Sequence, residues 1–357
     1  MTYYLDPFGC VKNQVDAENM MALLNEEGWV AAENSEYADL IIVNSCGFIE
    51  SAKQESINAV LSWRKHCPDK KILLAGCLAQ RYAKELSEEL PEADAFFGIS
   101  DLSGIVVAAA ALMSKPKPAQ KAKVFTAAGS RPLLSPPGSA YVKISEGCDN
   151  CCSYCAIPLI RGAFKSRHIQ DIAEECKTLL QRGIKELCLI GQDLGSYGKD
   201  LSDSPGGLAA LLEVLSGLDG DFWVRLLYIH PDHFPPILDI MEKDKRFLPY
   251  FDIPFQHSSE KILKAMNRRG NYDTYLELIK TIRKRFDDAV IRTTFLTGFP
   301  GETEEDFALL LDFQEKLRAD WLGCFAYSRE EDTPAYDMKG RPPKKLAAER
   351  KRLIEER

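Results

Sequence analysis

Three closely spaced cysteines, Cys148, Cys152 and Cys155, form the pattern C-x3-C-x2-C. Three thiolates at this spacing can bind three irons of a 4Fe-4S cube, which leaves the fourth iron open. An open iron can chelate the amino and carboxylate groups of S-adenosylmethionine, and an electron from the cube can then break the sulfonium carbon–sulfur bond. A zinc knuckle or a reduced, buried cysteine group is the weaker alternative. Zinc usually takes four ligands, and no suitably spaced His or Cys pair completes the set.

Two residues inside this motif affect the assignment. Tyr154, directly before the third cysteine, favours the interpretation as a cluster that cleaves S-adenosylmethionine to a radical. Cys151 also creates the pattern C-x2-C-C-x2-C. Because adjacent side chains point in different directions, two neighbouring cysteines rarely bind one metal together. We therefore expect Cys151 to be a bystander.

Three further cysteines, Cys10, Cys46 and Cys77, form a triplet whose members are far apart in the sequence. Each of these cysteines comes within a few residues of the end of a predicted strand and has a glycine beside it. The carboxyl ends of neighbouring parallel strands share one edge of a sheet, so the three thiols could converge there. A single such cysteine would more often be a small buried hydrophobe. Three at equivalent positions predict a second cluster, whose open iron could hold an exogenous sulfur species.

The other cysteines have no partner spacing. The total of eleven is odd and no secretory signal is visible, so a disulfide framework is not expected. Cys188 and Cys324 lie in apolar runs and are predicted to be in the core. Cys67 and Cys176 are expected to be half-exposed helix residues.

Two polar segments leave alternatives open. The segment His230-Pro231-Asp232-His233 follows a predicted strand and could face a cavity, although a turn with polar ends explains it nearly as well. Arg161 follows the cysteine loop and could steady an anionic group or support the loop.

The elements that must position these residues alternate between strands and helices, which predicts an α/β fold. Residues 1–112 are expected to form a parallel sheet with helices on its faces, with strands at 3–5, 40–43, 72–74 and 95–97. Residues 113–138, rich in Pro and Lys, are interpreted as a linker. Residues 139–340 contain six β/α units, which predict a partial, TIM-like (β/α)6 barrel with its site at the carboxyl ends of the strands.

Length and charge set further limits. The 357 residues suit two domains, and the net charge of −8 argues against general nucleic-acid binding. No apolar run of about 18 residues is present, so we expect a cytoplasmic protein without a membrane partner. Residues 341–357 are charged and helix-like and stop without a capping turn, which suggests a truncation.

The cysteine loop resembles that of the radical S-adenosylmethionine superfamily, and the resemblance continues downstream. It implies that segments after the second, fourth and fifth barrel strands face the cofactor. The cofactor-binding residues implied in this way are Tyr154, Gly191, Gln192, Asp193, Gln256, Gly298, Gly301 and Glu302. For the last segment a helix-capping turn is also compatible, because Glu302, Glu304 and Glu305 suit a helix start.

Together the two triplets resemble the radical methylthiotransferase family over essentially the whole chain. One branch of this family modifies adenosine in transfer RNA, and another modifies an aspartate of the small-subunit ribosomal protein S twelve. Residues 9–18, 44–56 and 76–82, with Gln256-His257, resemble the second branch. The family also has a small C-terminal β-domain. We expect that domain to be missing here, which puts substrate docking in doubt.

The resemblance implies two 4Fe-4S clusters, S-adenosylmethionine and a reducing electron donor. One cofactor molecule would methylate sulfur held at the cluster of residues 1–112, and a second would generate the radical that takes hydrogen from the aspartate β-carbon. The alternatives are a transfer-RNA methylthiotransferase, which the acidic charge disfavours, and an iron–sulfur electron carrier. A carrier would usually have complete four-cysteine sets.

Overall fold

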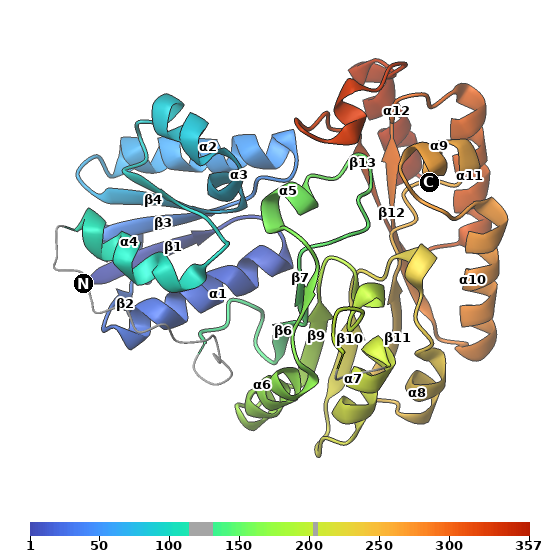
Figure 1. Ribbon diagram of the computed structural model, residues 1–357, viewed down its shortest axis with the longest axis horizontal. Helices are drawn as coiled ribbons and strands as arrows, with labels where there is room; N and C mark the ends of the chain where they lie inside the picture. Colours follow the sequence, from blue (N-terminus) through green and yellow to red (C-terminus); the bar gives the residue numbers. More distant parts are fainter. Residues whose placement is uncertain (114–130, 203–205) are drawn as a thin grey trace. The chain divides into compact units, whose positions relative to one another are not determined.

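The computed structural model describes residues 1–113, 131–202 and 206–357. It divides into two compact units (Figure 1). The first consists of Met1–Tyr141 with Leu159–Gly162, and the second of Val142–Pro158 with Ala163–Arg357. The Lys- and Pro-rich part of the predicted linker lies outside the described residues.

The first unit contains a five-stranded parallel sheet in the order β2-β1-β3-β4-β5. Its strands are β1 (Thr2–Pro7), β2 (Val30–Ala31), β3 (Leu40–Ser45), β4 (Lys71–Gly76) and β5 (Ala95–Phe97). Its helices are α1 (Val11–Glu26), α2 (Glu50–His66), α3 (Cys77–Glu89) and α4 (Ile105–Leu112). The predicted parallel sheet is therefore confirmed, and the short edge strand β2 and helix α4 are additions to it.

Alternation along the central strands gives this sheet two buried faces. On β3, Leu40 and Ile42 pack in the core that includes α1 and α4, whereas Ile41 and Val43 pack in the core that includes α2 and α3. Figure 1 shows these helix pairs on opposite sides of the strands. A strand buried on both faces appears as a continuous apolar run, which explains why residues 40–43 were recognisable in the sequence.

A six-stranded sheet in the order β13-β12-β11-β10-β9-β6, the reverse of chain order, belongs to the second unit except for residues 139–141 of β6, which are grouped with the first. These strands are β6 (Ser139–Lys143), β9 (Glu186–Ile190), β10 (Trp223–Leu226), β11 (Phe247–Asp252), β12 (Val290–Thr297) and β13 (Trp321–Ala326). Neighbours from β9 to β13 pair in parallel. The predicted open (β/α)6 sheet is confirmed, with β6 and β13 at its edges (Figure 1).

Helices follow the strands of this second sheet and cover it (Figure 1). They are α6 (Ile169–Gln181), α7 (Gly207–Ser216), α8 (Leu238–Lys243), α9 (Glu260–Ala265), α10 (Tyr272–Arg285), α11 (Glu304–Leu317) and α12 (Lys344–Glu355). A two-stranded ribbon of β7 (Ser145–Glu146) and β8 (Lys165–Ser166), with the short helix α5 (Ile157–Arg161), completes the elements discussed below.

Three details differ from or extend the expectations. Cys176 is fully buried, so its predicted half-exposure is wrong: it continues the apolar face of α6 that holds Ile172 and Leu179. Cys188 and Cys324 are buried, as predicted. Helix α12 is not merely a charged tail, because Ala347 and Ile354 are buried. In the described ranges, no helix is both long and apolar enough to cross a membrane.

Candidate functional site

The first cysteine triplet lies at the carboxyl ends of three adjacent strands. Cys10 follows β1 and caps α1, Cys46 directly follows β3, and Cys77 directly follows β4. The register aligns these ends, because Pro7 pairs with Asn44 and Ser45 pairs with Gly76. The sheet order β1-β3-β4 therefore brings the three cysteine loops to one edge, as the sequence predicted.

Glycines allow these loops to approach one another. A side chain at Gly47 would place its Cβ atom 2.7 Å from the carbonyl oxygen of Cys77, and one at Gly9 would lie 3.1 Å from the Cβ atom of Cys46. Gly76 adopts φ +102°, a conformation that other residues rarely take. The glycines beside the cysteines thus fit one loop against the next.

The buried side chain of Asn13 joins all three loops. Its Nδ2 atom donates to the carbonyl oxygens of Phe8, at 2.7 Å, and Ser45, at 3.1 Å. Its Oδ1 atom lies 3.7 Å from the Sγ atom of Cys77. One amide therefore holds the loops in register around the thiols.

The guanidinium of Arg161 lies next to Cys77, the most buried of these three thiols. Arg161 Nη2 lies 3.2 Å from Cys77 Sγ and 2.9 Å from an Asp16 carboxylate oxygen. Burial raises the pKa of Cys77 to about 12, and the positive charge of Arg161 partly offsets that rise. Burial also raises the pKa of Cys46. Arg161 thus lies beside a thiol, a group that is deprotonated wherever it acts as a metal ligand.

The second triplet lies in the loop between β7 and α5, at the carboxyl end of β6. Burial raises the pKa of Cys148 to about 11, and the neighbouring Cys152 adds to that rise. Across the described ranges, no three His, Cys, Asp or Glu side chains are grouped as ligands of a single metal ion. The ligands of a cube bind separate irons, so their thiols can lie farther apart than those around one ion.

This cysteine loop is bound to the turn that follows α9. Ser153 donates from its backbone N to Met266 O, at 3.1 Å, and from its Oγ to Ala265 O, at 2.7 Å. Asn267 Nδ2 donates to the carbonyl oxygens of Asn150 and Cys151, at 3.2 and 3.0 Å. These bonds fix the turn, and the arginine that follows Asn267, relative to the cysteines.

Two nitrogen-bearing side chains approach Cys152. Arg268 Nη1 lies 3.9 Å from its Sγ atom, and His230 Nε2 lies 4.0 Å from it. Arg268 is 5% exposed and His230 is 8% exposed. Burial lowers the pKa of His230 to about 3, so its ring is neutral near pH 7.

Tyr154 packs edge-on against Phe299, with the ring centroids 6.5 Å apart.

The segment Gly191-Gln192-Asp193 follows β9 and lies beside β7. A side chain at Gly191 would place its Cβ atom 2.6 Å from Ser145 Oγ. Gln192 Nε2 lies 3.3 Å from a Glu146 oxygen, whereas Gln192 Oε1 is buried with no hydrogen-bond partner among the described residues.

Asp193 is buried and bonded to protein donors. Its carboxylate accepts from Gly195 N, Ser196 Oγ, His230 N and Asn150 Nδ2, at 2.8 to 3.1 Å. Asp193 thus joins the loop after β9, the loop after β10 and the cysteine loop. In this arrangement it positions these loops.

The segments after β11 and β12 meet through buried polar groups. Gln256 has φ +69° and forms an isolated bridge with Phe295. His257 Nδ1 accepts from the backbone N atoms of Ser258 and Ser259, both at 2.9 Å, so Nε2 carries the proton. His257 Nε2 lies 3.8 Å from Glu302 Oε1.

Gly298 and Gly301, which precede α11, have structural roles. A side chain at Gly298, whose φ is +74°, would collide with Ala347 of α12. Glu302 accepts from Gly298 N and lies 3.4 Å from Arg350 Nη1. Gly301 donates to Gly340 O at 2.9 Å. The helix-capping alternative holds as well, because Thr303 and Asp306 form a capping box at the start of α11.

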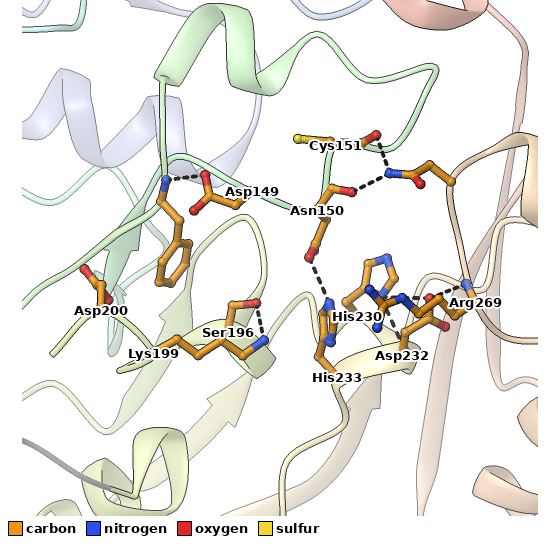
Figure 2. A pocket seen from close by; sticks show the side chains of 12 residues that line it. Asp149, Asn150, Cys151, Ser196, Lys199, Asp200, His230, Asp232, His233 and Arg269 are labelled. Carbon is orange, nitrogen blue, oxygen red and sulfur yellow. Dashed lines mark hydrogen bonds and ion pairs between the residues drawn. The ribbon is translucent and has the colours of Figure 1, made fainter. Parts of the chain in front are cut away.

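A polar cavity of about 430 Å³ lies beside the cysteine loop (Figure 2). It is lined by Asp149, Asn150, Cys151, Phe164, Ser196, Lys199, Asp200, His230, Asp232, His233, Asn267 and Arg269. Figure 2 shows His233 reaching Asn150, at 3.0 Å. The segment 230–233 therefore both forms a turn and faces a cavity. Cys151 is exposed, with φ +48°.

Several residues around the thiols were given no role at the site from the sequence: Asn13, Asp16, Ser145, Glu146, Asn150, Asn267 and Arg268. Each belongs to an element distant in sequence from the atoms that it contacts, or to an ordinary turn. An asparagine before an Arg-Arg pair, as at Asn267, carries no local signal of a cluster.

Comparison with known proteins agrees with this architecture. The model of the family described as Uncharacterized protein family UPF0004 matches residues 2–98, and the Radical SAM superfamily model matches residues 142–313. Membership of that superfamily implies a 4Fe-4S cluster and S-adenosylmethionine.

Solved structures with low sequence identity share the fold. The radical S-adenosylmethionine methyltransferase TsrM from Kitasatospora setae superposes with a TM-score of 0.65 at 14% identity, covering 94% of this chain and 73% of that one. The cobalamin-dependent radical enzyme OxsB superposes with a TM-score of 0.58 at 12% identity, covering 99% of this chain and 56% of that one. At such identities the likeness concerns the fold alone.

Curated relatives are much more similar. Ribosomal protein uS12 methylthiotransferase RimO of Treponema denticola is 51% identical, covering 97% of this chain and 80% of the relative. RimO of Thermosipho africanus is 43% identical, covering 100% of this chain and 82% of the relative. By this identity over nearly its whole length, the chain belongs to the RimO family of radical S-adenosylmethionine methylthiotransferases.

Proposed function

We propose that this protein adds a methylthio group to the β-carbon of an aspartate in ribosomal protein uS12. The observation that carries the proposal is the 51% identity, over 97% of the chain, with a relative named for action on that protein. Two cysteine triplets at the carboxyl ends of parallel strands support it. A C–H bond of this kind is too weakly acidic for a side-chain base at neutral pH, so radical chemistry suits the task.

Cys148, Cys152 and Cys155 would hold the cluster of the radical domain, residues 139–340. When bound, this cluster supplies the electron that cleaves S-adenosylmethionine. The site fits an anionic group: Arg268 is 5% exposed, and Asp232 attracts its charge without coming within ion-pair distance in the described part of the chain. A buried charge is costly unless it is closely paired, and a thiolate-bound cluster beside Arg268 would provide further counter-charge.

Cys10, Cys46 and Cys77 would hold a second 4Fe-4S cluster in the domain of residues 1–112. The three thiols lie at one sheet edge, with Arg161 3.2 Å from Cys77 Sγ. Their loops are joined by hydrogen bonds from Asn13 and by close contacts at the glycines. The cradle is therefore preformed by the chain itself.

Side chains after the barrel strands would orient the cofactor. Gln192, with its buried and unpartnered Oε1 atom, is suited to accept a hydrogen bond from an amino group. Asp193 and Gly298 would act by shaping the loops, since the Asp193 carboxylate and the Gly298 backbone N already bond within the protein. Glu302 bonds Gly298 through one oxygen, whereas its buried Oε1 atom has no hydrogen-bond partner among the described residues. The residues proposed to form the cofactor site, by contact or by shaping its loops, are Tyr154, Gly191, Gln192, Asp193, Gln256, Gly298, Gly301 and Glu302.

The net charge of −8 favours a basic protein partner over transfer RNA. The test is anaerobic reconstitution with iron and sulfide, followed by turnover with S-adenosylmethionine and a one-electron reductant. Protein uS12 and transfer RNA are offered in parallel, and products are identified by mass. Methylthiolated aspartate is expected. Methylthio-adenosine without modified aspartate would overturn the substrate assignment and leave the radical chemistry standing.

A further inference from the structure

The side chain of Arg268 is almost fully buried, and no carboxylate of the described residues lies within ion-pair distance of it, although Asp232 is near enough to attract its charge. Its Nη2 atom donates to Pro254 O at 2.7 Å, and its Nε atom is buried with no hydrogen-bond partner among the described residues. Its Nη1 atom points toward Cys152 Sγ, at 3.9 Å. The nearby Asp232 carboxylate is occupied by Tyr275 Oη and by Arg269 N, at 3.0 and 2.7 Å.

The fold holds this guanidinium at the thiol. Arg268 directly follows Asn267, whose φ of +60° turns the chain after α9. Asn267 Nδ2 and both polar groups of Ser153 bond this turn to the cysteine loop. Arg268 N in turn donates to Leu263 O at 2.8 Å. Without these bonds, ordering the long side chain of Arg268 beside the thiol would cost rotamer entropy that no other contact offsets.

We propose that Arg268 is a positioning residue that raises the reduction potential of the radical-domain cluster through a fixed positive charge and an N–H···S contact to Cys152. This inference rests on the proposed role of Cys152 as a cluster ligand. Reduction adds negative charge to the cluster, so a buried cation stabilises the reduced form. Hydrogen bonds to the ligand sulfurs and net local charge are established determinants of such potentials. Guanidinium stays protonated at every working pH.

The chain offers a matched control. Arg269 is the next residue and carries the same charge, but it is exposed and lines the polar cavity. Solvent and salt screen an exposed charge far more than a buried one. Replacing Arg269 should therefore change the reduction potential of the cluster little, although it changes the net charge of the protein by the same amount as replacing Arg268.

The test uses the full chain with Cys46→Ala, so that the radical-domain cluster alone contributes to the signal. Iron content is measured first, and the reduced cluster is then titrated against potential by electron paramagnetic resonance. Arg268→Gln should lower the ratio of reduced to oxidised cluster at fixed potential about tenfold, equivalent to about 59 mV for one electron. Arg268→Lys should recover part of the loss. If the Arg268→Gln variant has the same reduction potential as the Cys46→Ala parent in which it is made, the inference is overturned.

A second measurement does not depend on the stability of Arg268→Gln. In the parent labelled with ¹⁵N-arginine, pulsed resonance of the reduced cluster should show a nitrogen coupling that Arg268→Lys loses and Arg269→Gln keeps. Absence of that coupling in the parent also overturns the inference. A parent that forms no 4Fe-4S signal contradicts instead the ligand assignment under the proposed function.

Discussion

Arg161 Nη2 lies 3.2 Å from the Sγ atom of Cys77. The same nitrogen is paired with Asp16 at 2.9 Å, and both side chains of that pair are at most 2% exposed. Arg161 is the last residue of α5, the helix that begins directly after the second cysteine loop, yet it belongs to the first compact unit. A residue close in sequence to one cysteine triplet thus supplies the cation beside a member of the other.

Breaking this buried pair should destabilise the protein strongly. Arg161→Met leaves the Asp16 carboxylate buried without that partner, and the expected loss is about 3–5 kcal/mol of unfolding free energy. Thermal unfolding measures it. Arg352→Met, which breaks an exposed pair with Glu356, is the control and should change little. The double variant Arg161→Met/Asp16→Leu should recover stability, and an Arg161→Met protein as stable as the parent would contradict the role of the pair.

Asn13 should be required to hold the loops of the first triplet. Asn13→Asp removes the donor to Phe8 O and Ser45 O, and each carbonyl left without a partner costs about 1–3 kcal/mol. We expect a lower unfolding temperature and less iron per chain. Asn34→Asp is the matched control, because Asn34 caps a turn as an acceptor and aspartate caps equally well. Equal iron in both variants would rule out this function of Asn13.

The two triplets should bind iron independently. Replacing Cys148, Cys152 and Cys155 with Ala should remove about half of the iron, since each three-cysteine set holds one 4Fe-4S cluster. Cleavage of S-adenosylmethionine should stop in that variant. Iron analysis and detection of 5′-deoxyadenosine measure both effects. Full iron retention would refute the ligand assignment.

Cys46→Ala should separate the two halves of the reaction. Cleavage of S-adenosylmethionine to 5′-deoxyadenosine should continue, because the radical-domain cysteines are unchanged. Methylthiolation should be lost, because the sulfur site lacks one ligand. Chromatography of the cofactor products, together with mass analysis of uS12, distinguishes these outcomes. A folded Cys46→Ala protein with no cleavage activity would argue against this division of labour.

Cys151 should be dispensable for metal binding. It is exposed and lines the cavity of Figure 2, and its φ of +48° is one that glycine adopts without strain. Cys151→Ser should keep its iron and its cleavage activity, and Cys151→Gly should be at least as stable as the parent. Cluster loss in the Ser variant would instead make Cys151 a ligand.

The sequence by itself determined the order of strands and helices and the spacing of the thiols. Buried strands such as residues 40–43 appear as apolar runs, and amphipathic helices such as α10 show their period, because both patterns are local. Parallel strands also bring their carboxyl ends to one edge, so a common edge for Cys10, Cys46 and Cys77 was predictable from the sequence, although the sheet order that makes their strands neighbours was not. The (β/α)6 sheet followed from the same regularities.

Only the tertiary structure decided what surrounds the thiols. Arg161 at Cys77, Arg268 at Cys152 and the amide of Asn13 across three loops are contacts between segments far apart in sequence. Tertiary packing likewise buried Cys176 and placed Ala347 of α12 against Gly298. Such contacts depend on sheet order, register and loop conformation, for which a single sequence carries no periodic signal. The grouping of the cysteines was therefore predictable from the chain, whereas the charged side chains that lie beside them were not.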